Sequence, residues 1–62
     1  MSVTKQQRNS KGLVRIIYDS SDMASVWWCC RTRAGTISEG RHDDIDAITA
    51  TEIFEELCRI FA

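Results

Sequence analysis

The sequence predicts a small α+β domain in which an antiparallel β-hairpin or three-stranded sheet carries one C-terminal helix on one face. Two observations lead to this fold class. Two short runs rich in β-branched and aromatic residues flank a turn-forming cluster, and the last segment repeats its apolar residues at helical spacing. The 62 residues provide one domain at most. A core of this size is marginal without a partner or a staple.

Residues 1–11, MSVTKQQRNSK, are polar and show no hydrophobic periodicity. We therefore expect a flexible, mildly basic arm there. The remaining residues, 12–62, are expected to form a single small ββ(β)α domain.

Two strands are predicted, over about 12–19 and 24–33. The first run, GLVRIIYD, opens with a glycine and closes with an aspartate, and the second run, ASVWWCCRTR, ends before an Ala-Gly pair. Between them, DSSDM supplies Asp and Ser side chains that bond the local backbone in turns. A third short strand over 36–39 is an option, and the EGRHDD segment is interpreted as a loop.

The final segment predicts an amphipathic helix from about 49 to 61. Thr49 and Glu52 have the spacing of a capping box, and Ile48 and Ile53 have the spacing of a hydrophobic staple. An isolated helix of this length is marginal in water, so it must pack on the sheet. Its apolar residues at helical spacing are Ile53, Phe54, Leu57, Ile60 and Phe61.

A five-residue loop over 19–23 fixes which strand residues lie opposite each other and therefore share a face. It pairs Tyr18 with Ala24, Ile16 with Val26, and Val14 with Trp28. The face expected under the helix is Val14, Ile16, Tyr18, Ala24, Val26, Trp28 and Cys30. The opposite face is Leu13, Arg15, Ile17, Ser25, Trp27, Cys29, Arg31 and Arg33, and it places Arg15 across from Trp27 at cation–π range.

The opposite face is more apolar than a solvated sheet face should be, because it keeps Leu13, Ile17, Trp27 and Cys29. Tryptophan, arginine and aliphatic side chains together are typical of interface hot spots. Three alternatives stay open. In the first, the arm or the third strand covers this face, or the register is shifted by one residue. In the second, another copy of the chain covers it in a homodimer. In the third, a different partner covers it. The candidate partner-binding residues are Arg15, Ile17, Trp27, Cys29, Arg31 and Arg33.

The net charge of −1 is unevenly distributed along the chain. Residues 1–35 hold six Lys or Arg against two Asp, and residues 36–62 hold two Arg against seven acidic residues. The basic half is compatible with a sheet that stacks a nucleic-acid base on Trp27, although the net acidic charge argues against this. The cations expected around Trp27 are Arg15, Arg31 and Arg33 with Lys5, Arg8 and Lys11 of the arm. The acidic half predicts a secondary surface that would imitate phosphates: Asp43, Asp44, Asp46, Glu52, Glu55 and Glu56.

No pattern in the sequence predicts a catalytic residue, a cofactor or a metal site. The three cysteines lack metal-ligand spacing, so we interpret them as reduced, half-buried thiols. His42 with Asp43 and Asp44 lacks the spacing of a calcium loop. A chain of 62 residues leaves little room for the cleft in which acid–base chemistry positions two groups, so we expect His42 to be a solvated loop side chain. The chain shows neither a signal-peptide layout nor an apolar run long enough for a bilayer. A cytoplasmic protein is therefore expected.

Together these features predict a non-enzymatic protein-binding module. It would be an inhibitor or adaptor that acts by direct contact with a protein partner or with a second copy of itself. By analogy alone, small compact chains of this kind suggest a phage or mobile-element accessory protein of the host-takeover or anti-defence kind. The alternative is a nucleic-acid-binding protein that uses Trp27 and the surrounding arginines.

Overall fold

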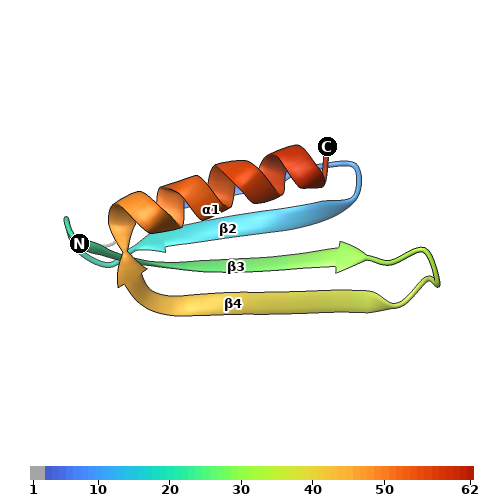
Figure 1. The fold of residues 1–62 in the computed structure, drawn as a ribbon, viewed down its shortest axis with the longest axis horizontal. Coiled ribbons are helices and arrows are strands. Elements are labelled where there is room, and N and C mark those ends of the chain that lie inside the picture. The colour runs from blue at the N-terminus through green and yellow to red at the C-terminus, as the bar shows by residue number, and fades with distance from the viewer. Residues whose placement is uncertain (1–2) are drawn as a thin grey trace.

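A computed structural model describes residues 3–62 as a four-stranded antiparallel sheet with one C-terminal helix along one face (Figure 1). The strands follow one another in space as they do in sequence, β1-β2-β3-β4. The α+β class with a C-terminal helix is confirmed, but the sheet has more strands than the sequence predicted. The elements are β1 (Val3–Arg8), β2 (Gly12–Tyr18), β3 (Met23–Arg31), β4 (Ile37–Asp46) and α1 (Ala47–Ile60).

Strand β1 lies where the sequence predicted a flexible arm. It pairs with β2 without a register shift, so that Val3 lies opposite Tyr18 and Arg8 lies opposite Leu13. All six residues of β1 are exposed, which explains why the sequence shows no apolar alternation there. The expectation of an arm is therefore wrong for residues 3–8, and the first two residues of that predicted arm lie outside the described part of the chain.

The β2–β3 hairpin has the predicted register, with Tyr18 opposite Ala24, Ile16 opposite Val26, and Val14 opposite Trp28. Its turn is closed by the backbone N–H groups of Asp19 and Ser20, which both donate to the carbonyl of Met23. The Ser20 hydroxyl accepts from the backbone N–H of Met23 at 3.1 Å, as expected for a turn rich in Ser and Asp. Strand β3 ends at Arg31, two residues before the predicted end.

Strand β4 is much longer than the predicted segment 36–39, and it includes the residues interpreted as a loop. The sequence did not predict its full length, because a bulge interrupts the alternation of side chains along the strand. Val26 pairs with His42 while Ala24 pairs with Ile45, so one residue of β3 opposes two residues of β4. Asp44, inside the bulge, has a φ of 51°, a left-handed conformation that aspartate adopts more readily than most residues.

Helix α1 begins directly where β4 ends. The carboxylate of Asp46 accepts hydrogen bonds from the backbone N–H groups of Ile48 and Thr49 at 3.0 and 3.2 Å, so Asp46 is the N-cap. The predicted capping box at Thr49 and Glu52 is therefore wrong, because Thr49 lies inside the first turn. Ile48 is 72% exposed and does not act as a staple.

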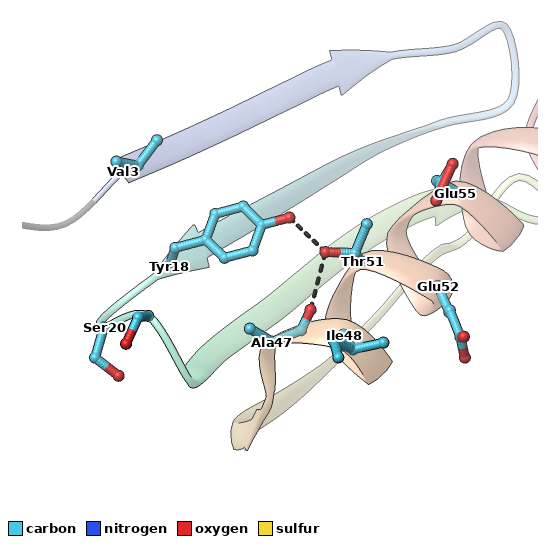
Figure 2. A pocket seen from close by; sticks show the side chains of 9 residues that line it. Val3, Tyr18, Ser20, Ala47, Ile48, Thr51, Glu52 and Glu55 are labelled. Atoms are coloured by element: carbon cyan, nitrogen blue, oxygen red, sulfur yellow. Dashed lines mark hydrogen bonds between the residues drawn. The ribbon is translucent and has the colours of Figure 1, made fainter.

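A side-chain hydrogen bond ties α1 to the sheet near the start of the helix. The hydroxyls of Tyr18 and Thr51 are 2.6 Å apart, and the Thr51 hydroxyl also donates to the carbonyl of Ala47 at 2.9 Å (Figure 2). Beside this contact, a groove of about 610 Å³ lies between the first turns of α1 and the end of the sheet, where Val3, Tyr18 and the β2–β3 turn line it. The helix therefore leaves the helix-side surface of β1 uncovered.

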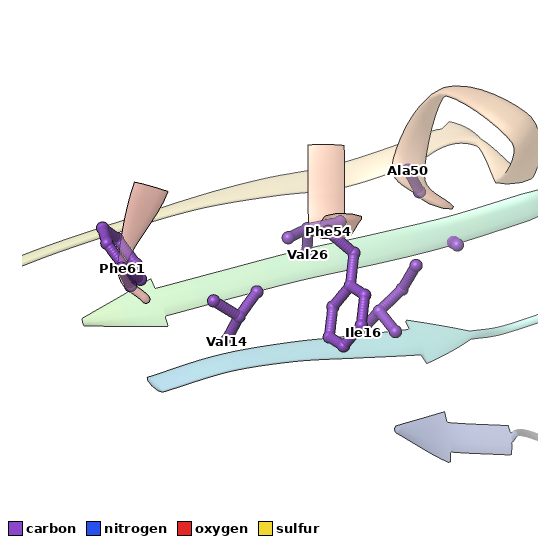
Figure 3. Close-up of a cluster of buried hydrophobic side chains, with 7 residues drawn as sticks. Val14, Ile16, Val26, Ala50, Phe54 and Phe61 are labelled. Atoms are coloured by element: carbon purple, nitrogen blue, oxygen red, sulfur yellow. The ribbon is translucent and has the colours of Figure 1, made fainter. Parts of the chain in front are cut away.

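The core lies between α1 and the two central strands. Phe54 in α1 and Phe61, the residue after α1, pack against Val14, Ile16 and Val26 on the sheet (Figure 3). All seven residues predicted for the helix-side face are buried or partly buried against this cluster, which confirms that prediction. The buried core residues are Val14, Ile16, Ala24, Val26, Ala50, Phe54 and Phe61.

Candidate binding site on the outer sheet face

The sheet face opposite α1, called the outer face below, is open along all four strands. Because residues that lie opposite each other share a face, the strand register collects the same set of side chains from each strand. Strand β1 adds to the edge of the sheet and does not fold over this face, so the interpretation that the N-terminal residues cover it is wrong for residues 3–8. The outer face consists of Thr4, Gln6, Arg8, Leu13, Arg15, Ile17, Ser25, Trp27, Cys29, Arg31, Ile37, Glu39, Arg41 and Asp43.

Trp27 lies in a cross-strand row that runs over the whole sheet in the order Gln6, Arg15, Trp27 and Arg41. The guanidinium carbon of Arg15 is 5.3 Å from the centroid of the Trp27 ring, which confirms the predicted cation–π contact. On its other side, Arg15 donates from Nε and Nη2 to Oε1 of Gln6 at 3.0 and 2.8 Å. Gln6 therefore holds the guanidinium group over the indole.

A hollow of about 240 Å³ lies next to Trp27. Arg15 and Ile17 line it from β2, and Arg41 and Asp43 line it from β4. Arg41 forms an ion pair with Asp43 at 2.7 Å. This pair is well exposed and contributes little to stability, but it fixes the position of Arg41 at the edge of the hollow.

A second row places Arg8, Leu13, Cys29 and Glu39 side by side. Cys29 is a free, half-buried cysteine. At the end of the sheet, Ile37 pairs with Arg31 and is 64% exposed. On this side of the Trp27 row, the outer face therefore mixes apolar and cationic side chains.

The charge of the outer face is mostly positive and mostly unpaired. Its four arginines face only two carboxylates, Glu39 and Asp43. Within residues 3–62, the ion pairs on either side of the molecule involve only Arg41 and Arg59. Arg8, Arg15 and Arg31 therefore have no carboxylate within 4 Å among the described residues.

The predicted partner-binding residues come together, with one exception. Arg15, Ile17, Trp27, Cys29 and Arg31 all lie on the outer face. Arg33 lies beyond the end of β3, in the exposed turn before β4. The sequence did not predict Gln6 and Arg41 as part of this face, because β1 and most of β4 were not predicted as strands. Arg8 was expected only as a cation of a flexible arm.

The predicted acidic residues do not form one surface. Asp43 lies on the outer face, and Asp46 is engaged as the helix N-cap. Asp44 lies in the bulge of β4. The other members, Glu52, Glu55 and Glu56, are exposed on α1, on the far side of the sheet.

The described residues offer no grouping of metal ligands. No cluster of three or more His, Cys, Asp or Glu side chains that could hold an ion occurs in residues 3–62. His42 lies in β4 and not in a loop, and its ring centroid is 5.4 Å from that of Trp28. The one helix of this part of the chain is too short and too polar to cross a membrane.

Known proteins give no further guide to this face. No family model matches the chain, and neither a curated protein nor a solved structure matches it.

Proposed function

We propose that the outer face binds single-stranded nucleic acid, with Trp27 as the stacking platform and the arginines as phosphate contacts. The observation that supports this proposal is the placement of Trp27. It lies between Arg15 and Arg41 in the middle of an open sheet face. Of the four arginines on this face, Arg8, Arg15 and Arg31 have no carboxylate within 4 Å among residues 3–62.

The shape of this face favours a single strand over a duplex. A single strand exposes the flat surfaces of its bases, and stacking of a base on an aromatic side chain contributes about 1–3 kcal/mol. Sheet surfaces that carry an aromatic residue are a common platform for such bases. Among residues 3–62, the outer face carries no helix that would enter the major groove of B-DNA.

The net negative charge of the chain does not oppose this proposal, because charge is separated between the two sides of the sheet. The outer face holds four arginines and two carboxylates. Glu52, Glu55 and Glu56 lie on α1, behind the sheet. A strand on the outer face would therefore meet positive charge nearby, and the acidic residues would be shielded by distance and salt.

A second candidate function is the protein-binding module expected from the sequence, either an inhibitor or adaptor or a homodimer. Leu13, Ile17 and Ile37 support it, because they add aliphatic surface around Trp27 and the arginines. This is the composition of a protein hot spot. The unpaired arginines favour nucleic acid over this candidate, since a protein partner would have to supply several matching carboxylates.

The two candidates are separated by the salt dependence of binding. The affinity for a labelled oligo-dT or oligo-U strand would be measured by fluorescence anisotropy at several salt concentrations between about 20 and about 300 mM. We expect the logarithm of the association constant to fall with a slope of about −0.7 per phosphate contacted. Trp27→Ala should weaken binding about 5- to 150-fold, which corresponds to the stacking energy.

The matched control is Arg59→Gln, which removes an exposed arginine on the helix side of the molecule. It should leave the affinity unchanged. Absence of oligonucleotide binding at the lowest salt would overturn the nucleic-acid proposal. Light scattering and partner capture with Trp27→Ala as a comparison would then test the protein-binding candidate.

A further inference from the structure

A second hollow lies at the end of the outer face where the β1–β2 loop passes. Its volume is about 310 Å³. Three cations line it, each from a different element: Arg8 from β1, Lys11 from the loop, and Arg31 from β3. Leu13 and Ile37 form part of its apolar wall, and no Asp or Glu lines it. We call it the basic hollow.

The backbone under the basic hollow is fixed from several sides. The N–H of Lys11 donates to the carbonyl of Phe61 at 2.9 Å, and the N–H of Arg31 donates to the carbonyl of Lys11 at 3.3 Å. The loop is therefore bonded both to the end of the helix segment and to β3. These bonds fix the backbone that carries the cations before a ligand arrives, which lowers the entropy cost of ordering the loop on binding.

Gly12 allows this close approach of the loop. A Cβ atom at this position would lie 2.6 Å from the carbonyl oxygen of Cys29 and 2.9 Å from the ring of Phe61. Any larger residue would push the loop away from β3. The sequence Lys11-Gly12 thus places a cation directly beside a position where the start of β2 packs closely against β3.

The donors of the basic hollow lack acceptors. Arg8, Lys11 and Arg31 have no carboxylate within 4 Å in the described chain. Like charges that share a hollow repel each other, and an oxyanion between them would remove this repulsion. Asn9 also lines the hollow, and its buried Nδ2 has no hydrogen-bond partner among residues 3–62.

From this arrangement we infer that the basic hollow binds a phosphate group of the nucleic-acid strand, an inference that rests on the proposed function above. Guanidinium and ammonium groups converging from three elements suit the oxygens of one phosphate. Cys29 lines the hollow and lies on the same face of β3 as Trp27, two residues away. The strand would therefore be anchored by a phosphate in the hollow while a neighbouring base stacks on Trp27.

The test compares salt slopes between variants. For Arg8→Gln and for Lys11→Gln, the salt slope of oligonucleotide binding should become less steep by about 0.7, with affinity about fivefold lower at 0.1 M salt. For Trp27→Ala, affinity should fall while the slope stays the same. Arg59→Gln serves as the control that changes neither. If the two hollow variants bind with the wild-type slope and affinity, the inference is overturned while the proposed function stands.

A second measurement separates a strand phosphate from free phosphate. Inorganic phosphate would be titrated at constant ionic strength, with chloride as reference, while the backbone amide NMR signals of residues 9–12 are followed. One outcome is that phosphate shifts these signals in the wild type but not in Lys11→Gln, while the wild type binds no oligonucleotide. This outcome would overturn the proposed function and leave a site for free phosphate. Absence of both responses would overturn both. Thermal unfolding of each variant checks that it is folded.

Discussion

The guanidinium carbon of Arg15 lies 5.3 Å from the centroid of the Trp27 ring, and the same guanidinium donates two hydrogen bonds to Gln6. One side chain thus connects three neighbouring strands, β1, β2 and β3. The contact links the edge strand to the stacking platform of the outer face. Its loss should affect both stability and the orientation of the indole.

We expect Arg15→Ala to lower the free energy of unfolding by about 1 kcal/mol, since an exposed cation–π contact contributes about 0.5–1 kcal/mol. Urea unfolding followed by tryptophan fluorescence measures this loss. Gln6→Ala is the comparison variant, because it removes the hydrogen bonds that hold the guanidinium group but keeps both members of the cation–π pair, so it should cost less than Arg15→Ala. Equal stability of Arg15→Ala and the wild type would show that the contact contributes nothing in solution.

Gly40 should resist substitution, because Trp28 lies against it on the helix side of the sheet. A Cβ atom on Gly40 would lie 2.8 Å from Cε2 of Trp28. Gly40→Ala must displace the indole, and overpacking of this kind costs about 1–3 kcal/mol. Chemical denaturation measures the loss. Ser38→Ala changes another residue on the same side of β4 and should cost much less, and similar losses for the two variants would contradict this account.

The sequence contained enough information for the central hairpin but not for the edges of the sheet. Strands β2 and β3 are short runs rich in β-branched and aromatic residues. The length of the turn between them gave the correct register, with Val14 opposite Trp28. Strand β1 has only exposed side chains, so its strand character comes from hydrogen bonding to β2. That pairing depends on tertiary context and leaves no apolar pattern to detect.

The end of the sheet and the start of the helix were obscured for different reasons. In β4 the bulge at Asp44 interrupts the alternation after His42, so the acidic run resembled a loop. The helix begins two residues before the predicted start, because Asp46 both ends β4 and caps the helix. Among the candidate site residues, those on β2 and β3 could be predicted. Arg41 could not, and Arg8 was expected only in a flexible arm, since the placement of both depends on the two edge strands.

The identity of the N-cap is testable by two single substitutions. Asp46→Ala should lower the free energy of unfolding by about 0.5–2 kcal/mol, because two backbone N–H groups lose their acceptor. Thr49→Ala should cost less, because the Thr49 side chain does not cap the helix. Thermal unfolding monitored by far-UV circular dichroism compares the two. A larger loss for Thr49→Ala would instead favour the capping box expected from the sequence.

The two arginines that flank the end of β3 should differ in their effect on ligand binding. Both were candidates in the sequence, but Arg31 lines the basic hollow while Arg33 lies in the exposed turn beyond it. We expect Arg31→Gln to reduce the salt slope of oligonucleotide binding by about 0.7 and the affinity about fivefold at 0.1 M salt. Arg33→Gln should change the affinity by less than about twofold, because screening weakens a charge that makes no direct phosphate contact.

Anisotropy titrations of the two variants, run side by side with one labelled strand, measure this difference. Each variant removes one positive charge from the chain, so a non-specific effect of net charge would lower the affinity of both variants equally. Equal losses would therefore contradict a defined phosphate site at the end of the sheet. A loss confined to Arg31→Gln would place the strand across the outer face between the basic hollow and Trp27.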